Sequence, residues 1–469
     1  MHLTRRTVLA SAVAAPLLPR AALAADNVSI RVDPRRVLRS LPADYMGLSF
    51  ESSAVARPGL LSADNHTYVQ LVRALGTNGV IRVGGNVSDY SSYDANGVPK
   101  THPKDTVLTQ GSFRRLRTFL DATGWNLIWG LNLGTGKLDN MVEEARAVAD
   151  AVGNRLIAFE VGNEPDLFVQ AGHRQGKYDY AAWHGEFRRY KSAIRAVLPA
   201  APFAGPDIAM HSLDWMQSFA KDEAGDLALL TAHHYITGQE NPVSTIPFML
   251  AEEKKYQPVL SKFQSISQAA RIPWRMCETS SFSGGGKAGV SDSFASALWA
   301  LDYLFVLAGY DCAGVNLQTG VNHLGVVSKY TPIHDDLAGR YTAAPEYYGL
   351  LAFAQAGKGQ QLAVTLDKGG LNLTAYATRA GSSVTLAVIN KDMSRDAAVS
   401  ISGLAARQAG AMRLSAPSLS ATSGVALGGA AVDANGKWTG GKSDKVRLSG
   451  GKAMLDVPSG SAALVTMTI

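Results

Sequence analysis

Two glutamates stand at the ends of apolar runs, where strands of a buried sheet are expected to finish. Glu164 follows the run RLIAFEVG within the stretch VGNEPDLF, and Glu278 closes the run PWRMCET within RMCETSSFSGGG. Strand propensity gives no reason for a carboxylate at such a point, so each is either an exposed loop residue or a functional group. A pair of opposed carboxylates is what glycoside cleavage requires, because one protonates the leaving oxygen while the other attacks the anomeric carbon.

The elements that must position these carboxylates are eight apolar runs between residues 45 and 356, which alternate with helix-like stretches. Continuous apolar runs are typical of parallel strands that are covered on both faces. The pattern predicts an α/β fold, a (β/α)8 TIM barrel over residues 41–356, whose functional groups gather at the C-terminal ends of its strands. Glu164 and Glu278 follow the fourth and seventh strands and are expected to face each other across the barrel mouth. The eight runs are YMGLSF, GVIRVGG, WNLIWGLNL, RLIAFEVG, APFAGPD, LALLTAHHY, PWRMCET and CAGVNLQ.

The pattern of apolar residues changes after the predicted barrel. Residues 357–469 contain short alternating runs, such as SVTLAVIN and SAALVTMTI, which are separated by Gly, Ser, Asn and Asp. This pattern predicts a smaller antiparallel β-sandwich domain. Residues 26–40, which include NVSIRVD, have the same character, so we expect them to add an N-terminal strand to that domain.

Four motifs carry a family resemblance: VGNEPDLF (161–168), HHY (233–235), ETSSFSGGG (278–286) and SDSFASALWALDYL (291–304). On these motifs the chain resembles glycoside hydrolase family 79, and within it the heparanase-like β-glucuronidases. The resemblance covers most of the predicted barrel. It implies a retaining mechanism in which Glu164 is the acid/base and Glu278 is the nucleophile.

The same resemblance implies roles for four residues around this pair. Asn163 matches the asparagine that bonds the sugar 2-hydroxyl, and Tyr235 matches the tyrosine that bonds the nucleophile. His233 and Arg82 match residues that support the nucleophile. Two other interpretations stay open at this point: His233 as a hydrogen-bonded core residue, and Arg82 as the counter-ion of a buried acid.

Recognition of an acidic sugar is expected from a glycine loop. SGGGKAG (283–289) directly follows the nucleophile and presents backbone N–H groups without obstruction from side chains, although the same composition also fits a flexible loop. The resemblance implies that Gly284 and Gly285 bind the uronate carboxylate together with a second loop, TGVNHLGVVSKYTP. Gly320 is the candidate in that loop, whose register the sequence leaves open.

Three further positions are expected to contact the sugar. Glu51 and Asn86 follow the first and second strands and align with family positions that contact it. The tryptophan that the wider clan carries on strand eight has no counterpart here, and Asn316 or Gln318 occupies that region. Heparanase-like members also lack this tryptophan, so the departure favours the narrower resemblance.

The N-terminus and the net charge give expectations about the localisation and the partners of the protein. Residues 1–25 contain paired Arg5 and Arg6, a short apolar stretch and the small-residue pattern Ala22-Leu23-Ala24, which predict a twin-arginine export signal and a periplasmic or secreted protein. The remaining chain has 42 basic and 39 acidic residues, a net charge of +3, which is weak evidence for a polyanionic partner such as nucleic acid. We expect no membrane span, no metal and no cofactor, and a monomer.

The sequence therefore predicts an exported retaining hydrolase that cleaves β-linked glucuronic acid in heparan sulfate-type glycosaminoglycans. Its expected partner is an anionic oligo- or polysaccharide that contains glucuronic acid. One alternative is an exo-β-glucuronidase that acts on small or plant glucuronides. Another is a non-catalytic carbohydrate-binding protein, against which the presence of both Glu164 and Glu278 counts.

Overall fold

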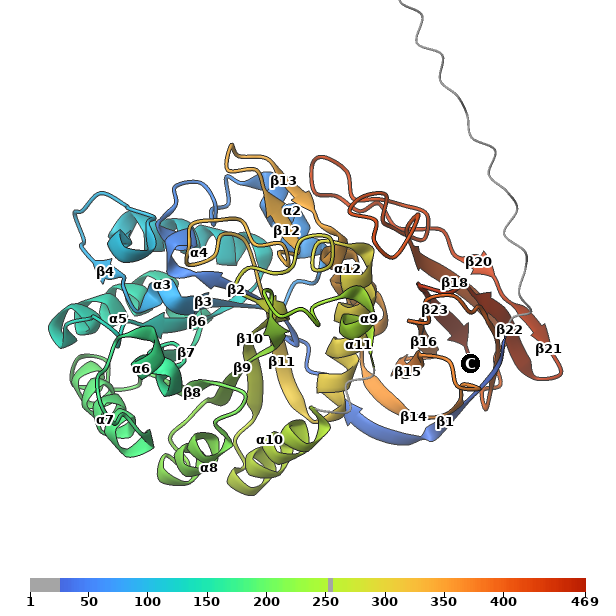
Figure 1. The fold of residues 1–469 in the computed structure, drawn as a ribbon, viewed down its shortest axis with the longest axis horizontal. Coiled ribbons are helices and arrows are strands. Elements are labelled where there is room, and N and C mark those ends of the chain that lie inside the picture. Colours follow the sequence, from blue (N-terminus) through green and yellow to red (C-terminus); the bar gives the residue numbers. More distant parts are fainter. Residues whose placement is uncertain (1–25, 252–255) are drawn as a thin grey trace, which may run out of the picture.

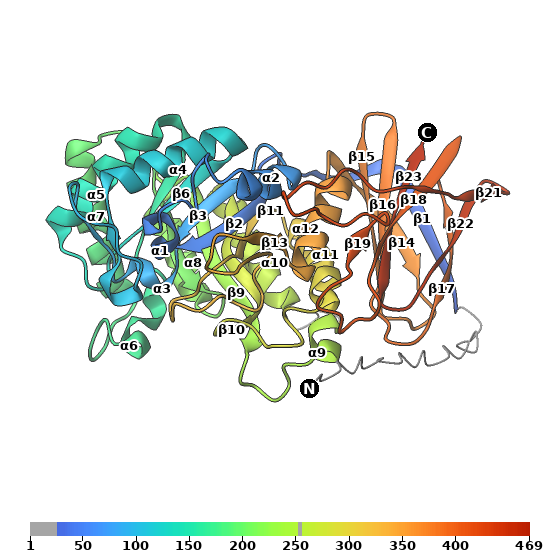
Figure 2. The same ribbon diagram turned by 90° about the horizontal axis from the view of Figure 1, so that it is seen from above.

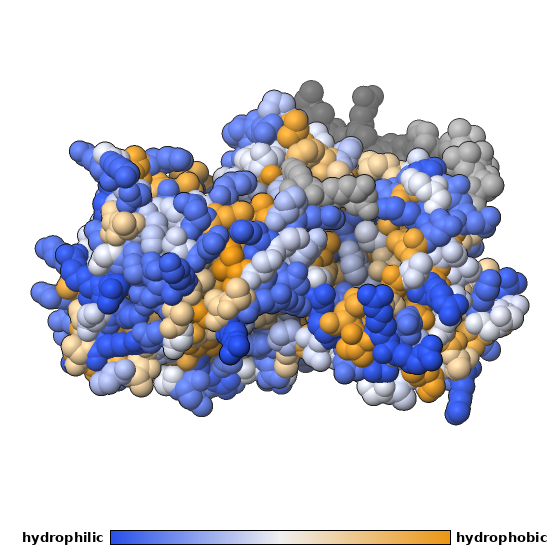
Figure 3. All heavy atoms as spheres, turned by 90° about the horizontal axis from the view of Figure 1, so that it is seen from below, coloured by the Kyte–Doolittle hydropathy of each residue, from blue (hydrophilic) through white to orange (hydrophobic). Residues whose placement is uncertain are grey.

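The computed structural model describes residues 26–251 and 256–469, which form a barrel and a β-domain lying side by side (Figure 1). The export signal predicted over residues 1–25 lies outside the described residues. Within the described part of the chain, no helix is long and apolar enough to cross a membrane. The face drawn in Figure 3 is largely hydrophilic over both domains, with apolar patches that hydrophilic residues interrupt.

Eight parallel strands form the barrel, in the order β7-β6-β3-β2-β11-β10-β9-β8. The circle closes between β7 and β8, where Phe159 bridges Phe203 in parallel and its N–H donates to the Pro202 carbonyl at 2.9 Å. The predicted fold class is confirmed, because each apolar run gives one barrel strand. These are β2 (Met46–Glu51), β3 (Val80–Gly84), β6 (Asn126–Leu131), β7 (Leu156–Val161), β8 (Ala204–Ala209), β9 (Leu229–Gly238), β10 (Trp274–Ser283) and β11 (Cys312–Gln318).

Helices surround the barrel, and their ends follow local rules. The side chain of Thr109 accepts the N–H of Ser112 to start α4, and Gly124 ends this helix in a left-handed conformation at φ 80°. The longer helices are α2 (His66–Ala74), α4 (Gln110–Thr123), α5 (Leu138–Val152), α7 (Tyr180–Val197), α8 (Leu213–Asp222), α10 (Gln257–Ala270), α11 (Phe294–Gly309) and α12 (Pro345–Ala356). Short elements lie in the loops: α1 (Ser52–Ala56), α3 (Gly85–Ser88), α6 (Phe168–Ala171), α9 (Ile246–Leu250), β4 (Ser92–Tyr93), β5 (Val107–Leu108), β12 (Ile333–Asp335), β13 (Tyr341–Ala343), and the 3-10 turns η1 (Pro103–Asp105), η2 (Gly153–Arg155) and η3 (Pro165–Leu167).

Eleven strands form the β-domain as one hydrogen-bonded sheet, in which β1 (Asp26–Ser40) is a central strand. β1 pairs antiparallel with β14 and parallel with β17, so residues from the two ends of the described chain share one core. Val28, Val384 and Val465 are among the buried residues that meet inside this sheet. The other strands are β14 (Gln360–Asp367), β15 (Leu373–Ala380), β16 (Ser383–Asn390), β17 (Ala397–Ser402), β18 (Gln408–Ser415), β19 (Ala426–Leu427), β20 (Asp444–Lys445), β21 (Arg447–Ser449), β22 (Lys452–Val457) and β23 (Ser461–Thr468).

Helices α11 and α12 lie between the barrel and the β-domain (Figure 2). Because both domains cover them, these helices are buried on nearly every side, and Leu464 of β23 joins their core. A buried ion pair spans the same interface, since Lys391 donates to Asp302 of α11 at 2.5 Å. Asp302 also accepts from Thr374 and Tyr376 of β15. Hydrogen bonds and apolar packing thus fix the β-domain against the barrel.

Candidate active site

The end of β7 turns sharply and presents Glu164 to the barrel mouth. Gly162 has φ 83° and Glu164 itself has φ 49°, a left-handed conformation that is uncommon for a residue with a side chain. The Glu164 N–H donates to the Asp207 carbonyl at 2.9 Å, across the point where the barrel closes. The strained turn is thereby tied to the neighbouring strand end.

Glu278 lies on β10 with both carboxylate oxygens engaged. Oε1 accepts from the Tyr235 hydroxyl at 2.8 Å, and Oε2 accepts from Arg82 Nη1 at 2.8 Å. Its side chain is 10% exposed, whereas that of Glu164 is 20% exposed. A carboxylate that accepts two such donors is held as an anion in one orientation.

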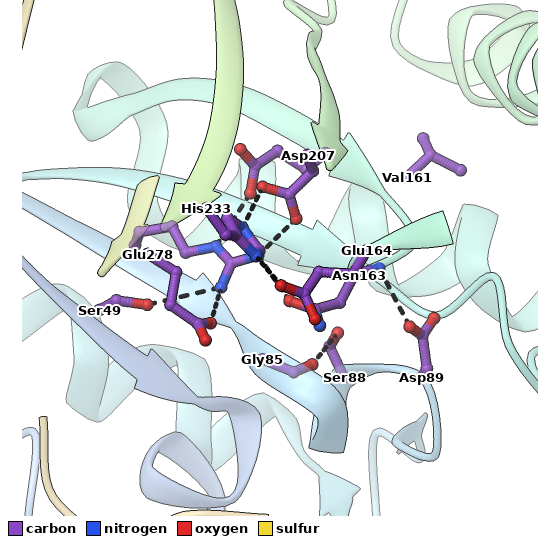
Figure 4. A network of polar contacts seen from close by, with 12 residues as sticks. Ser49, Gly85, Ser88, Asp89, Val161, Asn163, Glu164, Asp207, His233 and Glu278 are labelled. Atoms are coloured by element: carbon purple, nitrogen blue, oxygen red, sulfur yellow. Dashed lines mark hydrogen bonds and ion pairs between the residues drawn. The ribbon is translucent and has the colours of Figure 1, made fainter. Parts of the chain in front are cut away.

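Figure 4 shows Glu164, Glu278 and Asp207 within one network of polar contacts. Arg82, on β3, is fully buried and uses all of its N–H donors in this network. Burial alone would lower the pKa of Arg82, but the carboxylates of Asp207, Glu160 and Glu278 raise it well above its usual value. The guanidinium is therefore both a counter-ion and a fixed support. Its partners are Glu160, Ser49, Glu278, Asp207 and the Asn163 side-chain oxygen, the last at 3.0 Å.

His233, on β9, connects Glu164 with a third acid, Asp207. Its Nε2 lies 2.7 Å from Asp207 Oδ1, and its Nδ1 lies 3.2 Å from Glu164 Oε1. Burial lowers the pKa of His233, but the charge of Asp207 outweighs this effect, so the pKa is raised well above its usual value. For the Asp207 carboxyl, burial instead raises the pKa, but the charges of Arg82 and His233 outweigh burial and lower this pKa to about 2. His233 is thus an imidazolium that donates to both acids.

Sequence reasoning missed Asp207, Glu160 and Asp89, which hold the site from below. Asp207 ends the fifth apolar run in the same way that Glu164 follows the fourth, and this strand-end position is the signal that could have found it. Asp89 accepts the backbone N–H of Asn163 at 3.0 Å and those of two residues after β6, Leu133 and Gly134. It therefore fixes the loop that carries Asn163 and Glu164.

A cavity of ≈ 410 Å³ opens above this network and contains both glutamates. Glu51 lies in its wall, where its Oε2 accepts the Val87 N–H at 2.8 Å. Burial, and secondly the nearby charge of Glu278, raise the pKa of Glu51 to about 8. The lining also includes Asn86, Leu167, Ala209, Met210, His211, His233, Tyr235, Ile236, Ser283, Gly284, Gly285, Gln318, Asn322, His323 and Tyr330.

Gly284 and Gly285 line the same cavity in left-handed conformations, at φ 81° and 100°. Their carbonyls accept from the Gln239 side chain and from the Lys329 N–H, so the glycine loop is joined to the loop after β11. Neither glycine N–H donates to another described residue. Two backbone donors therefore remain available in the cavity that contains Glu278.

Asn163 and Asn86 meet at the edge of the cavity. Asn163 Nδ2 donates to Asn86 Oδ1 at 3.2 Å, while Arg82 holds the other end of the Asn163 amide. Both ends of the Asn163 amide are thus held, and Asn163 itself is buried next to the lining of the cavity.

Two predicted sugar contacts, Asn316 and Gly320, are wrong. Asn316 is fully buried inside the barrel, where Arg275 donates to its Oδ1 at 2.6 Å and its Nδ2 donates to the carbonyls of Leu48 and Val80. Gly320 lines a neighbouring hollow, and its N–H donates to Thr331 Oγ1 at 2.8 Å, so it has no amide to offer a carboxylate.

The residue that does reach the cavity from β11 is Gln318, two positions after Asn316. It is 3% exposed, and its Oε1 has no described hydrogen-bond partner. Both side chains point into the barrel, because alternate residues of a strand share one face, but Asn316 lies one layer deeper.

Comparison with known proteins agrees with this geometry. Residues 371–464 match the glycosyl hydrolase family 79 C-terminal beta domain. The chain is 25% identical over 371 residues to a β-glucuronidase of Aspergillus niger, an alignment that covers 72% of this chain and 68% of that protein. It is 28% identical over 238 residues to heparanase of Mus musculus, over 46% of this chain and 41% of that protein. A solved 4-O-α-L-rhamnosyl-β-D-glucuronidase of Fusarium oxysporum shares the fold, with a TM-score of 0.77 at 19% identity, over 94% of this chain and 100% of that chain.

A (β/α)8 barrel with an appended β-domain and two acids in its cavity, one just after the fourth strand and one within the seventh, defines a glycoside hydrolase. The chain is such an enzyme. The predicted resemblance to glycoside hydrolase family 79 is confirmed by the match of its C-terminal domain and by its relatives.

Proposed function

We propose that the protein is a retaining β-glucuronidase in which Glu278 is the nucleophile and Glu164 is the acid/base. One observation carries the assignment of roles: both oxygens of Glu278 accept hydrogen bonds, from Tyr235 and from Arg82. These donors hold Glu278 as an oriented anion at the cavity. The relatives named β-glucuronidase and heparanase support the choice of sugar.

In the first step, a Glu278 oxygen bonds to the anomeric carbon as the bond from that carbon to the leaving oxygen breaks. Glu164 gives its proton to the leaving oxygen, so the products are a glycosyl ester on Glu278 and a free alcohol. In the second step, Glu164 takes a proton from water, whose oxygen replaces the ester oxygen at the same carbon. Glu278 leaves as a carboxylate, and two displacements together retain the β-configuration.

The carboxylate of the sugar is assigned to the unpaired N–H groups of Gly284 and Gly285. Backbone donors aimed at one point recognise an anion without a cationic side chain. Asn163 is assigned to the sugar 2-hydroxyl, since Arg82 fixes its amide beside Glu164. The retaining mechanism also requires the carboxyl groups of Glu164 and Glu278 to lie about 5–5.5 Å apart.

The test is hydrolysis of 4-nitrophenyl β-D-glucuronide followed by proton NMR of the first product formed. We expect β-glucuronic acid to appear before its α-anomer, and the matching β-glucoside to be a much poorer substrate. Release of the α-anomer first would overturn the retaining mechanism, and a preference for the glucoside would overturn the sugar assignment.

Two modes of action follow from the sequence: endo-cleavage of heparan sulfate-type chains, as in heparanase, and exo-cleavage of small or plant glucuronides. Product sizes from heparan sulfate distinguish them, because endo-cleavage gives oligosaccharides and exo-cleavage gives free glucuronic acid. Export through the signal at residues 1–25 and a monomeric state are further proposals. N-terminal sequencing of the periplasmic fraction and light scattering test them.

A further inference from the structure

The side of the cavity that receives the leaving group can be identified from Glu164. An acid that protonates the leaving oxygen must lie beside it, so the leaving group lies against the neighbours of Glu164. Asp166, two residues on, accepts from the Ala209 N–H and from Ser212, which places the turn after Glu164 alongside the end of β8. The wall on this side is therefore formed by Leu167, Ala209, Met210 and His211.

This wall carries little polarity. Leu167 is partly buried, Met210 is 2% exposed, and His211 lies at the solvent-exposed edge. A hydrocarbon surface of this kind favours an apolar or uncharged group against it.

The charges around the cavity also favour an uncharged leaving group. Among the described residues that line it, three are glutamates and none is Lys or Arg. Burial raises the pKa of one of them, Glu51, to about 8, and the His233 imidazolium in the lining is already paired with Asp207 and Glu164. Arg82 lies beneath, but each of its five N–H donors already has a protein partner. Burial lowers the pKa of His323, although Glu278 and Glu164 act in the opposite direction, so this imidazole is neutral near pH 7.

Two cations next to the loops of the cavity are close to acidic side chains. Lys329 joins the glycine loop only through its backbone, and its ammonium group lies 4.0 Å from Asp292. Arg174, behind the turn that carries Glu164, donates to Glu186 and to the carbonyls of Leu133 and Gly134. An anion on the leaving group would therefore meet no described Lys or Arg in the lining of the cavity.

We infer that this enzyme accepts an uncharged, partly apolar leaving group and discriminates against sulfated or carboxylated ones. The inference rests on the proposed β-glucuronidase function. The site provides backbone donors for one anionic group, the uronate, and nothing for a second. A phenol, an alcohol or a neutral sugar fits the wall, so small neutral glucuronides rank ahead of sulfated polysaccharides as substrates.

The test compares 4-carbamoylphenyl and 4-carboxyphenyl β-D-glucuronide, two leaving groups of similar size that differ by one charge. We expect kcat/KM to be at least about tenfold higher for the carbamoyl compound at low salt. The gap should narrow at high salt, because salt screens charges near solvent. His211→Lys places a positive charge at the exposed edge, so it should also reduce the ratio of kcat/KM between the two compounds. His211→Gln changes the same side chain without adding a full charge, so it should leave this ratio unchanged.

The outcomes separate the inference from the function on which it rests. Equal rates for the two compounds, or a preference for the carboxylate, would overturn the inference while leaving the β-glucuronidase function intact. A gap that His211→Lys and His211→Gln change equally would also overturn it, because discrimination would then not depend on charge. Failure to hydrolyse either compound would overturn the proposed function, and the inference with it.

Discussion

The floor and the rim of the cavity are built in opposite ways. On the floor, Arg82, Asp207 and Glu160 are side chains of barrel strands, almost fully buried and joined by ion pairs. At the rim, Gly284 and Gly285 offer backbone groups from a loop in left-handed conformations. In the proposed mechanism, the floor fixes charges where bonds change, and the rim recognises the sugar. Changes to the floor should therefore cost activity and stability together, while changes to the rim should alter selectivity.

The largest expected effect is that of Glu278→Ala. Removing the nucleophile should lower kcat/KM for an aryl β-glucuronide by more than about 10³-fold, because the glycosyl ester cannot form. Azide should restore part of the activity by entering the vacated space and attacking the anomeric carbon from the α face. NMR of the product should therefore show the α-glucuronosyl azide.

Glu164→Ala is the matched variant for this experiment. Its nucleophile is intact, so azide attacks the glycosyl ester, and the product should be the β-azide with a substrate whose phenol leaves without an acid. The opposite pair of products would reverse the roles assigned to Glu164 and Glu278.

Asp207→Asn tests whether the buried charges of the floor stabilise the folded protein together. The variant leaves the buried Arg82 and His233 short of one negative charge, and breaking a buried pair costs about 3–5 kcal/mol. Urea unfolding measures the loss. Asp121→Asn is the control, because Asp121 also contacts two arginines, Arg117 and Arg155, but at the surface, where such pairs contribute about 0–1 kcal/mol. Similar losses for the two variants would contradict the assignment.

Glu51 lies in the cavity wall, at the boundary between floor and rim, and it should make the free energy of unfolding of the protein depend on pH. Its pKa is raised from 4.5 to about 8 by burial, so folding favours its protonated form. This contribution to stability is fully present below pH 4.5 and is lost as the pH rises toward 8. Glu51→Gln cannot ionise, so its free energy of unfolding should exceed that of the parent by about 1–4 kcal/mol at pH 8 and by little at pH 4.5. A difference that does not vary with pH would show that Glu51 is charged in the folded protein.

The two glutamates in the cavity could be predicted from the sequence better than the floor that supports them. Parallel strands are buried on both faces, so they appear as apolar runs, and the residues that end them are evident. Glu164 and Glu278 were found in this way, and Arg82 was found through the family resemblance. Asp207 also ends an apolar run but was missed, because nothing in the sequence shows that its backbone turns through φ 58° and directs its carboxylate inward.

Predictions failed where depth or loop path decides the contact. Asn316 and Gln318 share one face of β11, and only the barrel geometry shows which reaches the cavity. Gly320 lies in a loop whose path depends on a hydrogen bond to Thr331, eleven residues on.

The rim is tested by Gly285→Ala, for which we expect the smallest effect. At φ 100° an alanine is strained, and its Cβ would lie 2.7 Å from Asn322 Nδ2, so the loop or Asn322 must shift. The N–H groups would then no longer point at the uronate carboxylate, and we expect the transition state to be bound more weakly by about 1–3 kcal/mol. A β-glucoside carries a neutral hydroxymethyl group instead of the carboxylate, so it should lose less.

The measurement is the ratio of kcat/KM for aryl β-glucuronide over aryl β-glucoside, which should fall about 5- to 150-fold in Gly285→Ala. Gly289→Ala is the matched control: Gly289 lies in the same loop at φ 74°, with open space around its Cβ and no place in the cavity lining. Backbone strain alone would affect both variants, whereas loss of the carboxylate site would affect only Gly285→Ala. An unchanged ratio in Gly285→Ala would remove the glycine loop from sugar recognition and leave the uronate to be recognised by side chains, among which the described lining offers no Lys or Arg.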